Sequence, residues 1–311
     1  HQPIGRSNRP NSPKGRAAGG SNAISQCRSV SGTVESASMP TAPIRFGKVW
    51  TSLGRPVYGI AMPATPAWPP DSLPRLFVDT TLEDDGEIVI DAAQANYLVR
   101  VLRLKAGAQI KLFDNRTGEW LAELAHIGKR DAIVRVEGHL RPREIVPDLW
   151  LCFAPIKKGR IDWLVEKACE LGVARLVPVK TQRTIVDKVK STRLQSHIIE
   201  AAEQCERTSL PDLAELTPLD TLLSDWPEER RLYYAAERGG DSVTEVMSDS
   251  SGPAAILIGP EGGFTDAEDE KIRAKEASIP ISLGPRILRA DTAAITAIGI
   301  WMAHHGDWAI K

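Results

Sequence analysis

The sequence has few cysteines and no cluster of metal-ligating residues. Its four cysteines, Cys27, Cys152, Cys169 and Cys205, stand far apart, without the closely spaced pairs that zinc sites use. The six histidines form no motif either. We therefore expect reduced, buried thiols and no metal site.

Long apolar runs are also missing. No stretch approaches the roughly 20 apolar residues that a membrane helix requires, and the start of the chain lacks the apolar core of a signal peptide. With 42% hydrophobic and 25% charged residues, the composition is that of a globular protein, and 311 residues suggest two domains of ordinary size. We expect a cytoplasmic protein that does not bind a membrane.

A strong net charge is absent as well. Residues 1–73 hold eight Lys and Arg against two acidic residues, a net of +6, so a total of −1 leaves −7 for the rest of the chain. Bulk charge therefore gives no argument for binding nucleic acid, and that argument must rest on local basic clusters.

The first 73 residues differ in composition from the remainder. They are rich in Ser, Pro, Gly and Ala and show no sustained apolar periodicity. Such a segment buries too little surface to offset the entropy of ordering it. We expect residues 1–73 to be a disordered or non-native N-terminal extension, with Met62 as a candidate initiator.

Residues 74–144 predict a small β-barrel domain. Five short segments of alternating polarity, at 75–79, 87–90, 109–114, 119–125 and 131–137, are separated by turn signals. A helix is expected at 92–104, with Leu98, Val101 and Leu102 on its inner face. Arg100 and Arg103 lie on another face. From spacing alone, solvent exposure is the better interpretation of these two arginines.

Residues 147–311 predict an α/β domain. After a proline-bracketed linker at 142–147, strand patterns alternate with helix patterns, the first helix ending at Gly172. This alternation indicates a parallel sheet with helices on both faces.

Two strand–loop–helix units near the end of the chain predict a ligand pocket. The apolar strand 254–258 runs into the glycine-rich loop 259–263, and Thr265 with Glu268 forms a capping box that starts a helix. The strand 279–283 runs likewise into the loop 284–289, and Asp291 opens the last helix. Both loops should lie at the same edge of the sheet.

The exact amino-acid sequences of these two loops indicate a family more specifically than the spacing of their glycines does. LIGPEGGFTDAE and SLGPRILRADTAAI resemble the signature of the RsmE family, SPOUT-class methyltransferases, over residues 74 to about 306. The resemblance implies transfer of a methyl group from S-adenosylmethionine to N3 of uridine 1498 in 16S ribosomal RNA of the small subunit. It also implies a PUA-like RNA-binding barrel, a C-terminal trefoil knot in the SPOUT domain, and a homodimer.

The family match carries over to individual cofactor-binding residues. Backbone groups of both loops are expected to hold the cofactor, with Leu283 and Ile287 as apolar walls. The expected cofactor-binding residues are Ile258, Gly259, Pro260, Glu261, Gly262, Gly263, Leu283, Gly284, Arg286, Ile287, Leu288 and Thr292.

Chemistry at N3 of a uracil suggests the catalytic candidates. This nitrogen loses a proton as it is methylated, so the site must stabilise negative charge that develops on the ring. Arg289 or Arg207 can supply that stabilisation, and Arg286 is a further candidate. Asp291 either accepts the proton or is a plain helix N-cap, and the cap is the favoured interpretation.

RNA contacts are expected from two basic clusters in the chain. The residues concerned are Arg100, Arg103, Lys157, Lys158, Arg160 and Arg183. Two alternatives stay open: a SPOUT methyltransferase that acts on ribose or on transfer RNA, and a non-catalytic RNA-binding adaptor. The last helix, with Ile295, Ile298 and Trp301, is the candidate dimer interface.

Overall fold

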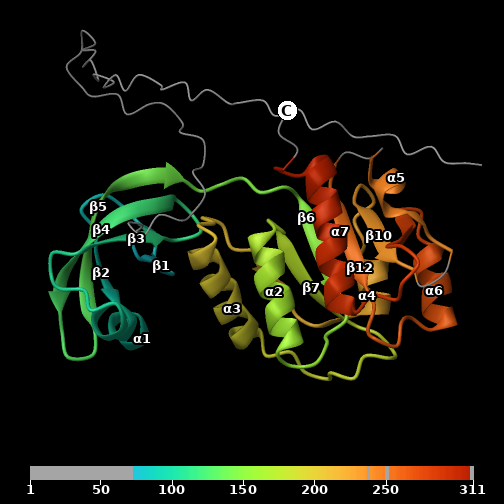
Figure 1. Ribbon diagram of the computed structural model, residues 1–311, viewed down its shortest axis with the longest axis horizontal. Helices are drawn as coiled ribbons and strands as arrows, with labels where there is room; N and C mark the ends of the chain where they lie inside the picture. Colours follow the sequence, from blue (N-terminus) through green and yellow to red (C-terminus); the bar gives the residue numbers. More distant parts are fainter. Residues whose placement is uncertain (1–72, 237–238, 249–251, 309–311) are drawn as a thin grey trace, which may run out of the picture. The chain divides into compact units, whose positions relative to one another are not determined.

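The computed structural model describes residues 73–236, 239–248 and 252–308, which all belong to one structural unit of the chain. The predicted N-terminal extension lies outside the described residues except for its last position. Two sheets make up the described chain (Figure 1), one formed by residues 75–142 and one that begins at residue 149.

The first sheet has five strands in the order β1-β3-β4-β5-β2. Each coincides with a predicted segment, so these predictions are confirmed. β1 pairs in parallel with β3, and the other neighbours are antiparallel. The strands are β1 (Arg75–Phe77), β2 (Glu87–Ile90), β3 (Gln109–Phe113), β4 (Gly118–Ile127) and β5 (Ala132–Pro142).

The helix after β2 departs from its prediction. It begins as α1 (Ala92–Asn96) and continues as a π-helical turn, η1 (Tyr97–Val101), closed by a bond of 3.0 Å from the Leu102 N–H to the Tyr97 carbonyl. A bond to the fifth residue turns each residue through a smaller angle than an α-helix does. Leu98 is fully buried as predicted, but Val101 is 62% exposed, so its predicted inward position is wrong.

The second sheet is parallel throughout, as predicted. Its main path runs β11-β13-β10-β12-β6-β7-β8, and β9 pairs with β7. The strands are β6 (Leu149–Phe153), β7 (Arg175–Lys180), β8 (Asp212–Leu213), β9 (Thr217–Pro218), β10 (Arg231–Ala235), β11 (Asp241–Ser242), β12 (Ala254–Ile258) and β13 (Ser278–Ser282).

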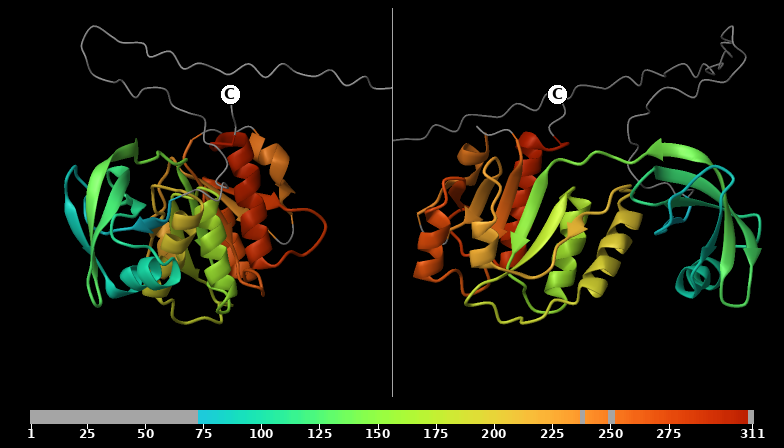
Figure 2. Two further views of the ribbon diagram at one scale, coloured as in Figure 1. Left: turned by 60° about the vertical axis from the view of Figure 1, so that its left-hand side comes forward. Right: turned by 180° about the vertical axis from the view of Figure 1, so that it is seen from behind.

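Helices cover both faces of this sheet (Figures 1 and 2), which confirms the prediction of a sheet between two helical layers. One face carries α2 (Arg160–Glu170), α3 (Ser191–Gln204), α5 (Val243–Ser248) and α7 (Ala290–His305), and the other carries α4 (Leu219–Ser224) and α6 (Asp266–Arg273). Side chains of a strand alternate between the faces. In β12, Ile256 packs in the core beneath α7, whereas Leu257 packs in the core with Ile272 of α6.

Several local predictions can be compared with the fold. Gly172, with φ +88°, follows the end of α2 as expected of a helix-terminating glycine. Cys152 and Cys169 are buried, and Cys205 is partly exposed. Ile298 and Trp301 are buried in the core at 0% and 3% exposure, so the prediction that they present an interface surface is wrong. Within the described chain, no helix has the length and apolar character needed to cross a membrane.

Arg75 at the start of β1 anchors the first sheet to α3. Its buried guanidinium donates to the carbonyl oxygens of Ala202 and Arg207, each at 2.6 Å. Its Nε donates to the carboxylate of Glu119 on β4, and its Cζ lies 4.0 Å from the ring centroid of Phe113. A buried cation is tolerated when its donors are satisfied in this way.

The partner carboxylate Glu119 is buried as well. Burial raises its pKa, but hydrogen bonds from Arg141 and Arg75 outweigh that effect, so the pKa of Glu119 lies below its usual value. A carboxyl group with a depressed folded-state pKa stabilises the fold above its unfolded pKa. This stabilisation is lost as the pH falls through the folded-state value.

Replacing Arg75 tests the importance of this anchor. We expect Arg75→Ala to lower the free energy of unfolding by about 3 kcal/mol or more, because it removes one of the two arginines that hold the buried Glu119 charge and takes a donor from two carbonyl oxygens. Urea denaturation followed by circular dichroism measures the change. The loss should shrink at acidic pH, where Glu119 is protonated.

Arg116 provides the matched control. It forms an ion pair with Asp79 at 2.8 Å, but the two side chains are 50% and 81% exposed. Exposed pairs contribute at most about 1 kcal/mol. Equal losses for Arg116→Ala and Arg75→Ala would contradict the anchoring role.

Candidate functional site

A pocket of about 180 Å³ lies at the carboxyl edge of the parallel sheet. β10 lies between β12 and β13, so the segments that follow these three strands meet at one place. The edge beyond the carboxyl ends of parallel strands is where open α/β sheets bind ligands. The expectation that the two loops share an edge is therefore met.

Most of the predicted cofactor residues line this pocket. Two of them do not: Gly262 faces Arg183, and Thr292 lies on the first turn of α7. The predicted residues in the lining are Ile258, Gly259, Pro260, Glu261, Gly263, Leu283, Gly284, Arg286, Ile287 and Leu288.

Sequence reasoning missed part of the wall. Ala235 and Ala236, at the end of β10, line the pocket together with Phe264. The two alanines could have been suspected, because they are small residues at the end of an apolar strand. The sequence does not reveal, however, that β10 inserts between β12 and β13. Phe264 lies so close to Gly259 that a Cβ there would sit 3.1 Å from the ring, so the glycine leaves room for the aromatic side chain.

Two contacts from the segment after β7 hold the glycine loop. Arg183 Nη1 donates to the carbonyl oxygens of Gly262 and Phe264, at 2.6 and 3.1 Å. Glu268 is buried and accepts from the backbone N–H groups of Thr265 and Gln182, at 2.9 and 2.8 Å. The predicted capping box is confirmed, and its glutamate also joins two neighbouring loops.

The second loop presents backbone to the pocket. Gly284 has φ +100°, a left-handed conformation that favours glycine. Within the described chain, Pro285–Leu288 form no backbone-to-backbone hydrogen bond, so their polar groups are available to a ligand. Ile287 is 96% exposed and therefore lines the pocket without closing it.

Arg289 follows this loop as the N-cap residue of α7. Its side chain makes no capping bond and is exposed, and no hydrogen bond or ion pair engages its guanidinium within the described chain. Its neighbours Leu288 and Ala290 line the pocket. Arg289 is thus a free cation next to the pocket.

Asp291 is not the N-cap of α7, and its carboxylate is engaged by an arginine. The helix begins at Ala290, and the buried Asp291 carboxylate forms a two-point ion pair with Arg160 at 2.9 and 2.6 Å. The expected N-cap role is therefore wrong. Arg160, predicted to contact RNA, instead fixes the start of α7 to the start of α2.

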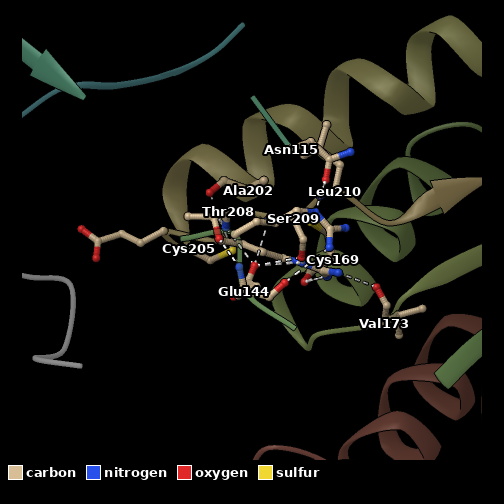
Figure 3. A network of polar contacts seen from close by, with 12 residues as sticks. Asn115, Glu144, Cys169, Val173, Ala202, Cys205, Thr208, Ser209 and Leu210 are labelled. Atoms are coloured by element: carbon tan, nitrogen blue, oxygen red, sulfur yellow. Dashed lines mark hydrogen bonds and ion pairs between the residues drawn. The ribbon is translucent and has the colours of Figure 1, made fainter. Parts of the chain in front are cut away.

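Arg207 belongs to a different part of the molecule, where its partners are Cys169, Val173 and Ser209, all three labelled in Figure 3. Its guanidinium is buried and donates to the carbonyl oxygens of Cys169 and Val173, at 2.7 and 2.8 Å, and to Ser209. Glu144, from the predicted linker, accepts from the Ser209 hydroxyl in the same network. Each guanidinium nitrogen has a structural partner, so this position gives no support to a catalytic role for Arg207.

The predicted RNA-binding residues fall in two places. Arg100 lines a pocket of about 570 Å³ with Lys129 and Arg130 of the β4–β5 turn, which sequence reasoning missed. Arg103 is exposed and has φ +58° at the end of η1. Lys157 and Lys158 are exposed in the loop after β6.

Comparisons with known proteins agree with this architecture. A family model described as the RNA methyltransferase PUA domain matches residues 90–137, and one described as the RNA methyltransferase domain matches residues 143–302. A ribosomal RNA small subunit methyltransferase E from Rickettsia conorii is 32% identical over 228 residues, which span 72% of this chain and 93% of that protein. The chain belongs to this methyltransferase E family. The resemblance read from the two loop motifs is confirmed.

Solved structures of methyltransferases have the same fold. A methyltransferase from Legionella pneumophila in complex with S-adenosylmethionine matches with a TM-score of 0.69 at 29% identity, over 76% of this chain and 99% of that one. A methyltransferase E from Neisseria gonorrhoeae bound to S-adenosylmethionine matches with a TM-score of 0.68 at 28% identity, with the same coverage. The predicted fold, a PUA-like domain before an α/β methyltransferase domain, is confirmed.

A side chain at Gly284 should damage the pocket. Valine is strained at a φ of +100°, and its Cβ would stand in open space at the pocket wall. We expect Gly284→Val to weaken binding of S-adenosylmethionine, the cofactor of the two solved relatives, by about tenfold or more. Isothermal titration calorimetry measures this affinity.

Gly107 gives the matched control for backbone strain. It has φ +89° and open space around its Cβ position, but it lies in the turn before β3. Gly107→Val should lower stability by a similar amount, on the order of 1–3 kcal/mol, and leave cofactor affinity unchanged. If both variants bind S-adenosylmethionine like the wild type, the loop of Gly284 is not part of the cofactor site.

Proposed function

We propose that this chain transfers the methyl group of S-adenosylmethionine to N3 of uridine 1498 in 16S ribosomal RNA of the small subunit. The observation that carries the proposal is the pocket formed after β10, β12 and β13 at the carboxyl edge of the sheet. Two relatives with this fold bind S-adenosylmethionine. Relatives named as small-subunit ribosomal RNA methyltransferases support the substrate.

The residues of the pocket fit this cofactor. S-adenosylmethionine supplies a methyl group on a positively charged sulfur. Leu283 and Leu288 provide apolar surface for an adenine ring, and the free backbone groups of 285–288 can bind its polar edge. Glu261 suits the cationic part of the cofactor, and Arg286 suits its carboxylate.

The chemistry of the substrate nitrogen determines what the protein must provide. N3 of uracil lies on the Watson–Crick edge, so the base must be unpaired or flipped out before it can react. As its proton leaves, negative charge spreads to the carbonyl oxygens of the ring. A cation that is not already paired can stabilise that charge, and Arg289 is such a cation beside the pocket.

RNA binding is assigned to two basic surfaces. We propose that residues 74–144 hold RNA through Arg100, with Lys129 and Arg130 from the neighbouring turn. In the catalytic domain, residues 147–311, Lys157 and Lys158 are placed to contact phosphate groups. Arg183 can contribute through its remaining donors, since only its Nη1 is engaged with the glycine loop.

The proposal includes a homodimer that works in the cytoplasm and contains the trefoil knot of the family. An exposed tryptophan on α2, Trp163, and the partly buried Ile295 on α7 supply apolar surface for a second copy. Sedimentation velocity at micromolar concentration tests the dimer, and a purely monomeric profile would contradict it.

The substrate can be tested in the source organism. In a strain that lacks this chain, mass mapping of 16S ribosomal RNA should show the loss of one methyl group at uridine 1498, and expression of the chain should restore it. A missing methyl group on another RNA would favour the alternative methyltransferases. Failure of the purified chain to bind S-adenosylmethionine would favour the adaptor.

Removing Arg289 tests its place in the chemistry. We expect Arg289→Ala to lower the single-turnover rate of methyl transfer, at saturating cofactor and RNA, by about a hundredfold or more, as for other donors to a developing oxyanion. The dissociation constants for cofactor and RNA should change little. Rapid-quench measurement of methylated RNA gives the rate.

Arg289→Lys separates charge stabilisation from a phosphate contact. Lysine keeps most of a phosphate contact but loses the planar pair of donors that reaches a uracil carbonyl. We expect the lysine variant to bind RNA normally and to remain slow. A rate within about threefold of the wild type for Arg289→Ala would exclude the catalytic role.

A further inference from the structure

A second pocket lies at the same sheet edge, beside β6 and β7. We call it the lysine pocket and define it by its basic rim, Lys158, Lys188, Lys190 and Arg193. Its volume, about 190 Å³, is close to the 180 Å³ of the cofactor pocket. Four segments form it: the loop after β6, the first turn of α2, the segment after β7, and the first turn of α3.

The rim carries excess positive charge. Within the described chain, Lys158, Lys188 and Lys190 have no ion pair and no hydrogen-bonded side-chain partner. Arg193 is paired with Asp162 at 2.5 Å, and Asp162, the acidic residue in the lining, also accepts from the Gly159 N–H. The pocket therefore presents three uncompensated ammonium groups.

The floor of the pocket is apolar. Ile156, Ile161 and Leu194 form part of it, and Val186 and Val189 contribute from the segment after β7. Ile185, next to this floor in sequence, is 74% exposed. An apolar surface bordered by cations suits a ligand with a flat ring and a phosphate group, which is the chemistry of an unpaired nucleotide.

The position favours RNA over an acidic protein as the occupant. β6 and β7 follow β12 in the sheet, so the pocket is displaced from the cofactor pocket by roughly two strand spacings, about 10 Å. The Arg160–Asp291 pair and the Arg183 contacts fix the loops between the two pockets. One unpaired strand can span this distance and place one base in each pocket.

We propose that the lysine pocket binds a nucleotide of the substrate RNA close to the target uridine. The apolar floor contacts the base, and Lys158, Lys188 and Lys190 contact phosphate groups. This inference rests on the proposed function, since it takes the methyl acceptor to be RNA.

The double variant Lys188→Ala/Lys190→Ala tests the pocket in the full-length protein. We expect weaker binding of protein-free 16S ribosomal RNA, and a slope of log K against log salt concentration that is smaller by about 1.4, because each phosphate contact to a single strand contributes about 0.7. Cofactor affinity and thermal stability should stay at wild-type values. Fluorescence anisotropy across a salt series measures the slope.

A second double variant controls for the loss of two charges. Arg231 and Lys275 line a pocket at the opposite, amino-terminal edge of the sheet. Arg231→Ala/Lys275→Ala should leave the salt slope unchanged. An unchanged slope in the lysine-pocket variant, or an equal change in both variants, would overturn the inference.

The failure of this inference can be told apart from failure of the proposed function. If the wild type binds and methylates 16S ribosomal RNA but the lysine-pocket variant binds it normally, the proposed function stands and the inference is wrong. If the wild type binds no RNA across the salt series, the proposed substrate class is wrong and the inference falls with it.

Discussion

The pairing of β10 with both β12 and β13 is the constraint on which the site depends. Tyr233, fully buried in β10, is in register with Ile256 on one side and Ile279 on the other. This pairing brings together loops that are about 20 residues apart in the sequence. A slip of one residue would exchange the side chains that pack on the two faces, Tyr233 on one and Tyr234 on the other, so the loop positions are set by the packing of the core.

Local features of the fold were predictable because their causes are local. The Thr265–Glu268 cap, the helix-ending Gly172, the strands of the first sheet and the longer strands of the second follow from side-chain periodicity and from hydrogen bonds between near neighbours. Val101 shows the limit of such reasoning. Its exposure depends on a π-helical bonding pattern, which the apolar spacing does not reveal.

Long-range pairings were not predictable from one sequence. Nothing near Arg160 or Asp291 indicates that residues 131 positions apart are joined by two hydrogen bonds. Arg207 similarly looked like a free cation, and its burial is decided by carbonyl oxygens at the end of α2. The cofactor loops could be predicted because their backbone conformation requires glycine and proline, which the sequence shows directly. The partner of an arginine, in contrast, depends on which chain segments fold around it.

The Arg75 anchor at one end of α3 and the lysine pocket at its other end make this helix a spacer. The 14 residues of α3 extend for about 21 Å at 1.5 Å per residue. Lys190 precedes its first residue, and the carbonyl oxygen of Ala202 near its last turn receives the Arg75 bond. Since a helix hardly changes its length, α3 keeps the first sheet and the catalytic edge at a set distance. If the first sheet holds RNA as proposed, recognition would depend on the spacing between two points of the folded RNA as well as on the fit of one base.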